Sequence, residues 1–340
     1  MPLVTVARTA RPSPLALLRH SDTPHPERSV AKGVLVKVRH GVYASAPAWK
    51  SLPPWDRYLA RVHAAALIHP DAIFCLESAA ALLGMPVFGD PVDVHILVPA
   101  RCASRLIAGV RAHRSSEDRT IVELGGLAMT SPEDTAVDLA RLRHPAIGLA
   151  MADAALRIET ESTAERLLLI NEARVSSRGR ALARWPLARA SARSETAIEA
   201  VSRAVIEWLG FPAPELQVVF RSSGKEDRSD FVWKQVGLGG EADGDLKFDG
   251  RYGDPRDVLR RQSLRDRRLR THLRAVAHWG WSDVTAITPL RDILTGAGLR
   301  AIAPEQTARL YSLRRSLTSL APPRRRTHAA SGPLRPREYS

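Results

Sequence analysis

The last third of the chain contains an order of predicted helices and strands that restricts its fold more than any other feature. Apolar side chains recur every three to four residues in the first segment, which predicts a helix, and short alternating runs between turns predict strands. The expected order is helix (194–209), strands (215–220, 228–233 and 240–245), helix (255–275), strand (275–279) and a helix starting near Ser282. This order predicts an α+β domain in which a three-stranded antiparallel meander packs against helices.

Three acidic residues lie on two of these strands. Asp230 belongs to the second strand, and Glu241 and Asp243 stand two residues apart on the third, so both point to one face of the sheet. Because an adjacent strand brings Asp230 near that pair, a hard cation such as Mg²⁺ or Mn²⁺ is needed to offset the repulsion between carboxylates. Glu195, three residues before Ile198 in the preceding helix, is a supporting candidate, because we expect its carboxylate to project along the inward edge of that helix. Lys247 could orient an attacking water or stabilise charge on a phosphate.

A purely structural explanation of these acids stays open. Acidic residues near strand ends are often solvated turn residues, and a glutamate in the first turn of a helix interacts favourably with the helix dipole. The spacing alone therefore leaves two alternatives, a metal site and a solvated acidic surface.

A basic hairpin is predicted near the N-terminus, in the segment GVLVKVRHGVYAS at residues 33–45. Valines alternate with other residues before a His-Gly turn, and Lys37, Arg39 and His40 lie at or near its tip. Together with a helical segment at roughly 14–32, the pattern is typical of a winged helix-turn-helix that binds DNA. The alternative is an ordinary small basic hairpin, because Pro24 and Pro26 interrupt the preceding helix.

The middle of the chain predicts a mixed α/β domain. Its clearest signal is Ser131-Pro132-Glu133-Asp134, where a capping serine, a proline and two acids mark a helix start. An Arg-, Ala- and Ser-rich segment that follows predicts a linker. The expected elements are helices at 60–67, 77–83, 132–142 and 146–157, strands at 91–99, 109–115 and 125–130, and the linker at 174–193.

The balance of charge favours a polyanionic partner. Lys and Arg number 50 against 36 Asp and Glu, which gives a net charge of +14 and favours DNA. The two cysteines, Cys75 and Cys102, lie too far apart for a CxxC zinc motif, and a reducing cytoplasm fits best. No apolar run is long enough for a membrane span, and the N-terminus makes a poor signal peptide. We expect a soluble cytoplasmic protein.

Residues 194–284 resemble the endonuclease-like family related to very short patch repair nucleases, which belongs to the PD-(D/E)XK fold. The resemblance rests on SETAIEAVSR, RSDFVW, GEADGDLKF, LRD and WGWSDV. It implies a Mg²⁺-dependent nuclease in which Asp230, Glu241 and Asp243 hold the metal and Lys247 is catalytic, with Arg265 of the following helix in support. The sequence departs from the family at Gln262, often Glu, and at His278, often Arg, while its E-x-D motif departs from the E-x-K of the wider fold.

The first 180 residues resemble the AbiEi antitoxin family. GVLVKVRHGVYAS is similar to its winged-helix hairpin and MTSPEDTAVDLARL to its C-terminal domain. The resemblance implies DNA and a cognate toxin as partners. The combined architecture is similar to a group of uncharacterised actinobacterial proteins.

The sequence thus predicts an α+β multidomain protein with a winged helix-turn-helix, a mixed α/β domain and a restriction-endonuclease-like domain. The main hypothesis is a DNA-binding protein with a Mg²⁺-dependent endonuclease domain. The alternative is a non-catalytic AbiEi-type antitoxin or transcriptional regulator with a degenerate nuclease domain. The expected divisions are 1–54 (winged helix), 55–175 (AbiEi-like domain), 176–193 (basic linker), 194–298 (endonuclease-like domain) and 299–340 (helix and basic disordered tail).

Overall fold

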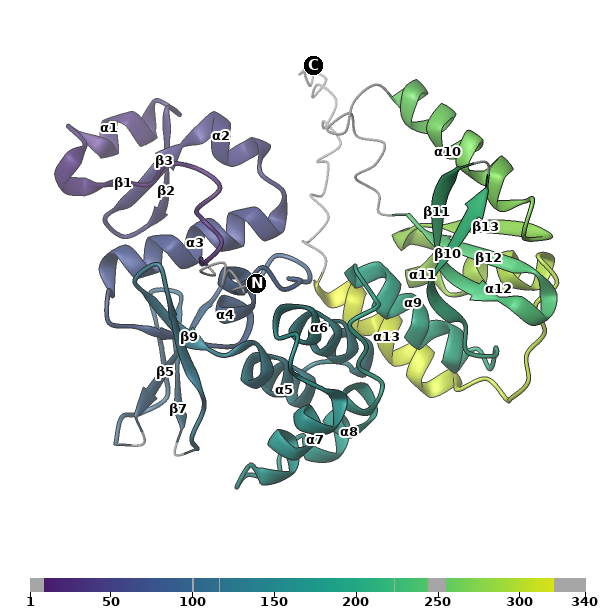
Figure 1. The fold of residues 1–340 in the computed structure, drawn as a ribbon. Helices are drawn as coiled ribbons and strands as arrows, with labels where there is room; N and C mark the ends of the chain where they lie inside the picture. Colours follow the sequence, from purple (N-terminus) through teal and green to yellow (C-terminus); the bar gives the residue numbers. More distant parts are fainter. Residues whose placement is uncertain (1–8, 100, 116, 223, 244–254, 321–340) are drawn as a thin grey trace, which may run out of the picture.

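A computed structural model of the chain describes residues 9–99, 101–115, 117–222, 224–243 and 255–320. Three parts follow one another along the chain (Figure 1). We call them the N-terminal module (9–52), the central domain (54–188) and the C-terminal domain (197–320). Among the described residues, no helix combines the length and apolarity that crossing a membrane requires. The predicted basic tail lies outside the described residues from position 321 onward.

The N-terminal module contains a three-stranded sheet in the order β1-β3-β2. The predicted hairpin is confirmed, because β2 and β3 pair antiparallel on either side of His40 and Gly41. The helix expected over 14–32 is much shorter, since Pro26 occupies its first turn and strand and 3-10 segments precede it. The elements are β1 (Leu18–Arg19), a 3-10 helix (His20–Asp22), α1 (Pro26–Ala31), β2 (Leu35–Arg39), β3 (Val42–Ser45) and α2 (Ala46–Ser51).

The central domain begins with a six-stranded mixed sheet in the order β6-β7-β5-β4-β9-β8. The two predicted helices are confirmed as α3 and α4, and Gly84 ends α4 with a left-handed φ of 74°. Strands β4, β6 and β8 were not expected; they are short and carry little alternation. The elements are α3 (Pro54–Ile68), β4 (Ile73–Phe74), α4 (Leu76–Leu83), β5 (Val94–Pro99), β6 (Arg105–Ile107), β7 (Val110–Ser115), β8 (Ile121–Leu124) and β9 (Leu127–Thr130).

Four helices complete the central domain. The predicted start of α5 is confirmed, because Ser131 Oγ accepts a hydrogen bond from the Asp134 backbone N–H at 3.1 Å. The segment 176–193, expected to be a linker, instead contains α8, whose Ala183 and Leu187 are fully buried. Because the segment contains many arginines, its narrow apolar face does not produce a helix signal in the sequence. The helices are α5 (Pro132–Leu142), α6 (Pro145–Ile158), α7 (Ala164–Ala173) and α8 (Arg180–Ala188).

The C-terminal domain has the predicted order of helices and strands. Its sheet is ordered β10-β11-β12-β13, with antiparallel pairing except between β12 and β13, which are parallel. The elements are α9 (Ala197–Trp208), β10 (Glu215–Ser222), β11 (Lys225–Trp233), a 3-10 helix (Lys234–Val236), β12 (Leu238–Ala242), α10 (Pro255–Leu269), β13 (Ala275–Trp279), α11 (Trp281–Ala286), α12 (Thr288–Gly296) and α13 (Thr307–Leu320).

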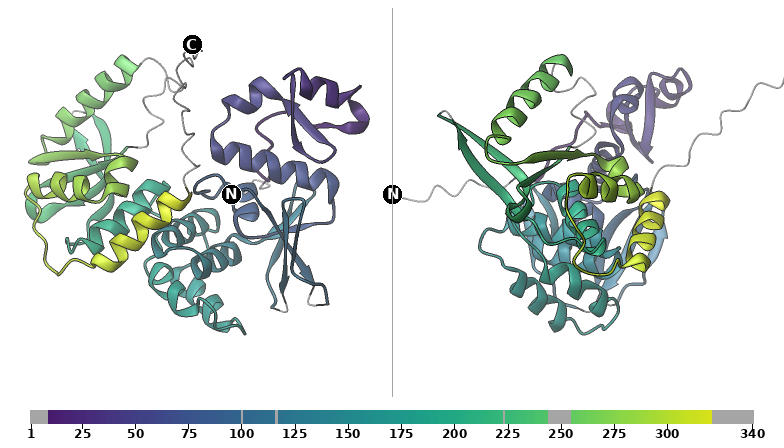
Figure 2. Two further views of the ribbon diagram at one scale, coloured as in Figure 1. Left: turned by 180° about the vertical axis from the view of Figure 1, so that it is seen from behind. Right: turned by 90° about the vertical axis from the view of Figure 1, so that its right-hand side faces the viewer.

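The central and C-terminal domains share one hydrophobic core. Leu149 of α6 packs in the same buried cluster as Trp208 of α9 and Leu313 of α13. Seen from behind, α13 (yellow) lies beside the helices of the central domain (Figure 2). At the same interface, Asp153 of α6 is fully buried and pairs with Arg203 of α9 at 2.8 Å. The two domains therefore form a single packed body.

Candidate functional site

Acidic side chains from α9, β11 and β12 meet on one face of the C-terminal sheet. Asp230 is anchored to the neighbouring strand, because its Oδ2 accepts a hydrogen bond from the Ala242 backbone N–H at 3.1 Å. Burial, and then the negative charge of Asp230, raise the pKa of Glu199 and raise that of Glu241 to about 7. The three carboxylates thus occupy one electrostatic environment.

Glu241 is the most deeply buried of these acids, with 2% of its surface exposed. Its Oε2 accepts a hydrogen bond from Arg265 Nη2 at 2.7 Å, which makes Arg265 its counter-charge. The same guanidinium also donates to the backbone carbonyl of Arg228. Glu241 Oε1 is buried and accepts no hydrogen bond of normal geometry from the described residues, although the Ser229 hydroxyl interacts with the Glu241 carboxylate and acts to lower its pKa. A buried oxygen of this kind is costly unless a donor or a cation satisfies it.

Gln217 of β10 connects two of the acids. Its Nε2 donates to Glu199 Oε2 at 2.9 Å and to Asp230 Oδ1 at 3.2 Å. The backbone of Gln217 has a φ of +53°, which is rare for a residue with a side chain and unexpected inside a strand. The neutral amide holds the two carboxylates together without cancelling their charge.

Asp243 takes part in a second polar chain. Its Oδ2 contacts His278 Nδ1 at 2.9 Å and Gln262 Nε2 at 3.2 Å, and His278 Nε2 contacts Asp266 Oδ2 at 3.0 Å. Burial disfavours the imidazolium, but the hydrogen bond to Asp243 and the charge of Asp266 outweigh it and raise the pKa of His278. Gln262 and His278, the two positions that depart from the family pattern, are therefore in contact with each other and with a predicted site residue.

The structure brings Asp230 and Glu241 together and joins Arg265 to Glu241. The other predicted residues of the C-terminal domain have different positions. Glu195 lies just before α9 and pairs with Arg228 at 2.6 Å, with 45% of its side chain exposed, so its predicted inward orientation is wrong. Lys247 lies outside the described residues.

Glu199 and Gln217, which also belong to this acidic face, were not predicted from the sequence. The pattern Thr196-x-x-Glu199 could have identified Glu199, because it is the signature of a helix start, and Thr196 Oγ1 does donate to Glu199 Oε1 at 2.7 Å. The role of Gln217 depends on an unusual backbone angle, for which the sequence contains no signal.

A divalent cation partly fits this site. Carboxylate oxygens are the ligands that Mg²⁺ and Mn²⁺ prefer, and the buried Oε1 of Glu241 beside Asp230 supplies a suitable donor. In the ranges that the structure describes, however, no group of three or more His, Cys, Asp or Glu side chains is arranged to hold a metal. The described residues thus provide two acidic ligands, Asp230 and Glu241, and the predicted third, Asp243, is engaged by His278.

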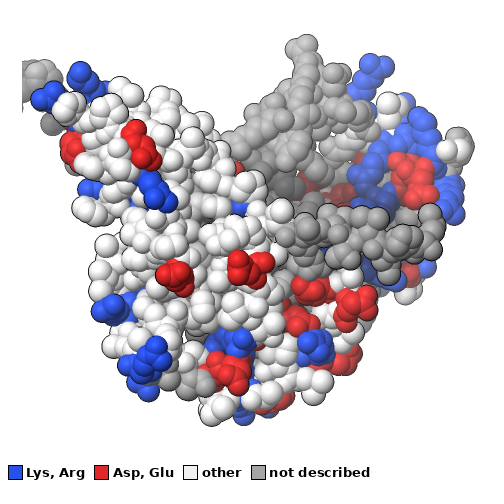
Figure 3. All heavy atoms as spheres, turned by 60° about the vertical axis from the view of Figure 1, so that its left-hand side comes forward, with Lys and Arg blue, Asp and Glu red and all other residues white. Residues whose placement is uncertain are grey.

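Basic side chains accompany the acids of the C-terminal domain. Figure 3 shows Lys and Arg side chains gathered around Asp and Glu side chains at the right of the view. On and just after α10, Arg260, Arg267 and Arg270 are exposed. Exposed guanidinium groups at this spacing suit contacts with a phosphate backbone.

The N-terminal hairpin presents two exposed basic side chains, Lys37 and His40. Arg39 has a different position, because its Nη1 donates to the Ala108 carbonyl at 2.8 Å and its Nη2 to the Gly109 carbonyl at 3.3 Å. Burial lowers the pKa of Arg39. Arg39 therefore fixes the hairpin to the β6–β7 turn of the central domain.

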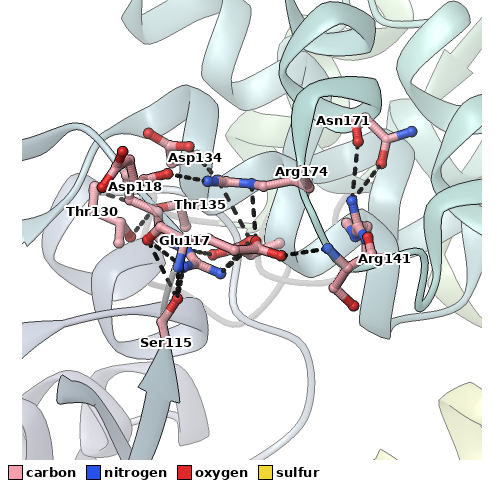
Figure 4. Close-up of polar contacts among 12 residues, drawn as sticks. Ser115, Glu117, Asp118, Thr130, Asp134, Thr135, Arg141, Asn171 and Arg174 are labelled. Carbon is pink, nitrogen blue, oxygen red and sulfur yellow. Dashed lines mark hydrogen bonds and ion pairs between the residues drawn. The ribbon is translucent and has the colours of Figure 1, made fainter. Parts of the chain in front are cut away.

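A buried ionic network holds the central domain together (Figure 4). Arg174 pairs with Asp134 of α5 and donates to the Asp118 carbonyl. Glu117 accepts a hydrogen bond from the Ser176 backbone N–H at 2.8 Å. The network joins the β7–β8 connection to α5 and to the segment that leads into α8. Its arginines are engaged by protein carboxylates and carbonyls, which indicates a structural role.

Comparison with known proteins identifies the central domain. Residues 72–184 match the family model of the AbiEi antitoxin C-terminal domain. The match includes most of α8, in agreement with its packing in this domain. The match shows that the central part of the chain is similar to the AbiEi antitoxin C-terminal domain.

Two relatives extend the similarity. The uncharacterized proteins MT2308 and Rv2248 of Mycobacterium tuberculosis are each 35% identical to the chain over 214 residues, which is 62% of this chain and 74% of each relative. The chain belongs to the family of these mycobacterial proteins. No solved structure gives a significant match. None of these findings bears on the resemblance of residues 194–284 to endonucleases, which stays a prediction.

Proposed function

We propose that the chain is a DNA-binding antitoxin-type regulator of a toxin–antitoxin system. The match of residues 72–184 to the AbiEi antitoxin C-terminal domain carries this proposal. Membership of that class implies a cognate toxin as a functional partner.

The N-terminal hairpin is the DNA-binding element in this proposal. Lys37 and His40 are exposed at and near its tip, while Arg39 donates its hydrogen bonds to the central domain. Lys37 and His40 therefore contact DNA phosphates or bases, and Arg39 holds the hairpin in the orientation that they require. Because Arg39 already holds the hairpin in place, the hairpin binds DNA with little loss of conformational entropy.

A binding measurement tests this role. Fluorescence anisotropy with DNA from upstream of the chain's own gene compares wild type with the double variant Lys37→Glu, His40→Glu. We expect the double variant to bind about tenfold more weakly or worse, because two phosphate-facing groups become repulsive. The exposed Arg300, replaced as Arg300→Glu, controls for the loss of a positive charge elsewhere on the surface. Equal binding by the double variant and wild type contradicts the proposal.

A second candidate function is metal-dependent cleavage of phosphodiester bonds by the C-terminal domain. The observation that favours it is that Asp230 lies near Glu241. The Oε1 atom of Glu241 is buried and accepts no hydrogen bond of normal geometry from the described residues. Asp230 and Glu241 would hold Mg²⁺ or Mn²⁺, with Asp243 as the predicted third ligand. When bound, the cation supplies charge neutralisation at phosphate and activation of water.

The protein's own residues prepare this site in defined ways. Arg265 compensates the buried charge of Glu241 at 2.7 Å. The exposed arginines at positions 260, 267 and 270 hold the nucleic-acid backbone. Lys247 keeps its predicted role of orienting water or stabilising charge on the phosphate.

Nicking of supercoiled plasmid with Mg²⁺ or Mn²⁺ tests the second candidate. We expect wild type to nick the plasmid and Asp230→Asn and Glu241→Gln to lose this activity. Asp292→Asn, at an exposed carboxylate on α12, is the matched control. Activity of Asp230→Asn equal to that of wild type removes the candidate, and a wild type that does not cleave leaves the regulator with a degenerate nuclease domain.

A further inference from the structure

Gln217 combines three unusual features in one residue. Its backbone φ of +53° lies in the left-handed region, although the residue belongs to β10. Both hydrogens of its amide are used, one on Glu199 and one on Asp230. Its Oε1 is buried and accepts no hydrogen bond from the described residues. A strained backbone and an unsatisfied acceptor at the same position point to a function for the side chain.

The register of the sheet explains the position of Gln217. Leu216 pairs with Phe231 and Val218 with Ser229, so Gln217 lies opposite Asp230 on the neighbouring strand. Residues opposite one another on antiparallel strands are close enough for their side chains to interact. The left-handed backbone occurs at the one position of β10 that faces the predicted metal ligand.

The chemistry of the amide matters as much as its position. Glu199 and Asp230 repel each other, and this repulsion contributes to the raised pKa of Glu199. A lysine or arginine between them would cancel their charge and weaken attraction for a cation. A glutamine donates to both carboxylates and leaves their negative charge in place.

Other contacts hold each acid on its own element, and Gln217 links the two acids. Asp230 uses its other oxygen, Oδ2, to accept from the Ala242 N–H, and Glu199 is also held by Thr196 and the Glu195 N–H. The helix start at α9 is thus connected through Gln217 to the strand that carries Asp230.

We propose that Gln217 is a positioning residue that fixes the Asp230 carboxylate for cation binding. The proposal rests on the second candidate function and deepens it. Gln217 acts through Asp230 and is not itself a catalytic residue.

Two variants distinguish the effect of losing the amide hydrogen-bond donors of Gln217 from the effect of its strained backbone. Gln217→Met keeps the approximate size and the left-handed backbone but removes both donors, whereas Gln217→Gly removes the donors and relieves the backbone. We expect Mn²⁺ affinity, measured by electron paramagnetic resonance, to fall about tenfold in both variants, as is typical when a partner of a metal ligand is lost. We expect Gln217→Gly to melt at a higher temperature than Gln217→Met. The exposed Gln235, replaced as Gln235→Ala, is the control.

A metal-independent signal completes the test. The Ala242 amide resonance reports Asp230 directly, because that N–H donates to Asp230 Oδ2. We expect this resonance to shift in both Gln217 variants and to stay unchanged in Gln235→Ala. An unchanged Ala242 resonance in both variants, or a Mn²⁺ affinity that follows melting temperature, overturns the proposal. If wild type binds Mn²⁺ no better than Asp230→Asn, the second candidate function fails, and the Ala242 resonance still decides the positioning role.

Discussion

The fully buried carboxylate of Asp153 forms an ion pair with the partly exposed Arg203 between the central and C-terminal domains. Its Oδ1 also accepts a hydrogen bond from the Ser191 backbone N–H at 2.8 Å. In Asp153→Ala, the Arg203 guanidinium loses its carboxylate partner at a largely buried interface. We expect this variant to lose about 3 kcal/mol of unfolding free energy, measured by urea denaturation at neutral pH. Asp292→Ala, on an exposed surface, is expected to change it by less than about 0.5 kcal/mol.

The same residue predicts a pH dependence. Burial, only partly offset by Arg203, raises the pKa of Asp153 from 3.8 to about 6 in the folded protein. A raised pKa contributes stability below the unfolded value, and this contribution is lost as pH rises through the folded value. We expect the stability of wild type relative to Asp153→Asn to be greater at pH 4.5 than at pH 7.5. A difference that is constant or grows with pH contradicts this environment for Asp153.

At the scale of elements, the β2–β3 hairpin depends on one side chain for its orientation. Arg39 donates to two carbonyls of the β6–β7 turn. We expect Arg39→Ala to increase amide hydrogen exchange of the hairpin and to weaken DNA binding, even though Lys37 and His40 are intact. Lys32→Ala, at the exposed end of α1, is the control. Unchanged exchange in Arg39→Ala means that the contact does not fix the hairpin.

Elements with local signals were predictable from the sequence, and elements that depend on tertiary contacts were not. The cap at Ser131, the stop at Gly84 and the turn at His40-Gly41 each act within a few residues, so their pattern is visible in the chain. Helix α8 was missed because only a narrow face of it is buried and Pro186 lies inside it.

The candidate site shows the same division. Asp230 and Glu241 were predictable because strand alternation and strand order bring them together. Gln217 and His278 reach the acids through a strained backbone and a long-range contact, and neither is encoded by spacing.

At the scale of the whole molecule, the shared core predicts cooperative unfolding. Leu149 of the central domain is 1% exposed and packs within the cluster of the C-terminal domain. We expect Leu149→Ala to cost about 3 kcal/mol and to lower the melting temperature of both domains in one transition. Leu169→Ala, on the surface of α7, is the matched control. Two separate transitions, with only one affected by Leu149→Ala, contradict a single packed body.

In the function that we propose, the basic hairpin at residues 33–45 binds DNA. The most direct measurement is the affinity of the full chain for DNA from its own upstream region, in EDTA so that no cleavage interferes. We expect specific binding by wild type and Arg300→Glu, and a loss of about tenfold or more in Lys37→Glu, His40→Glu. Specific binding that is equally strong in the double variant contradicts it.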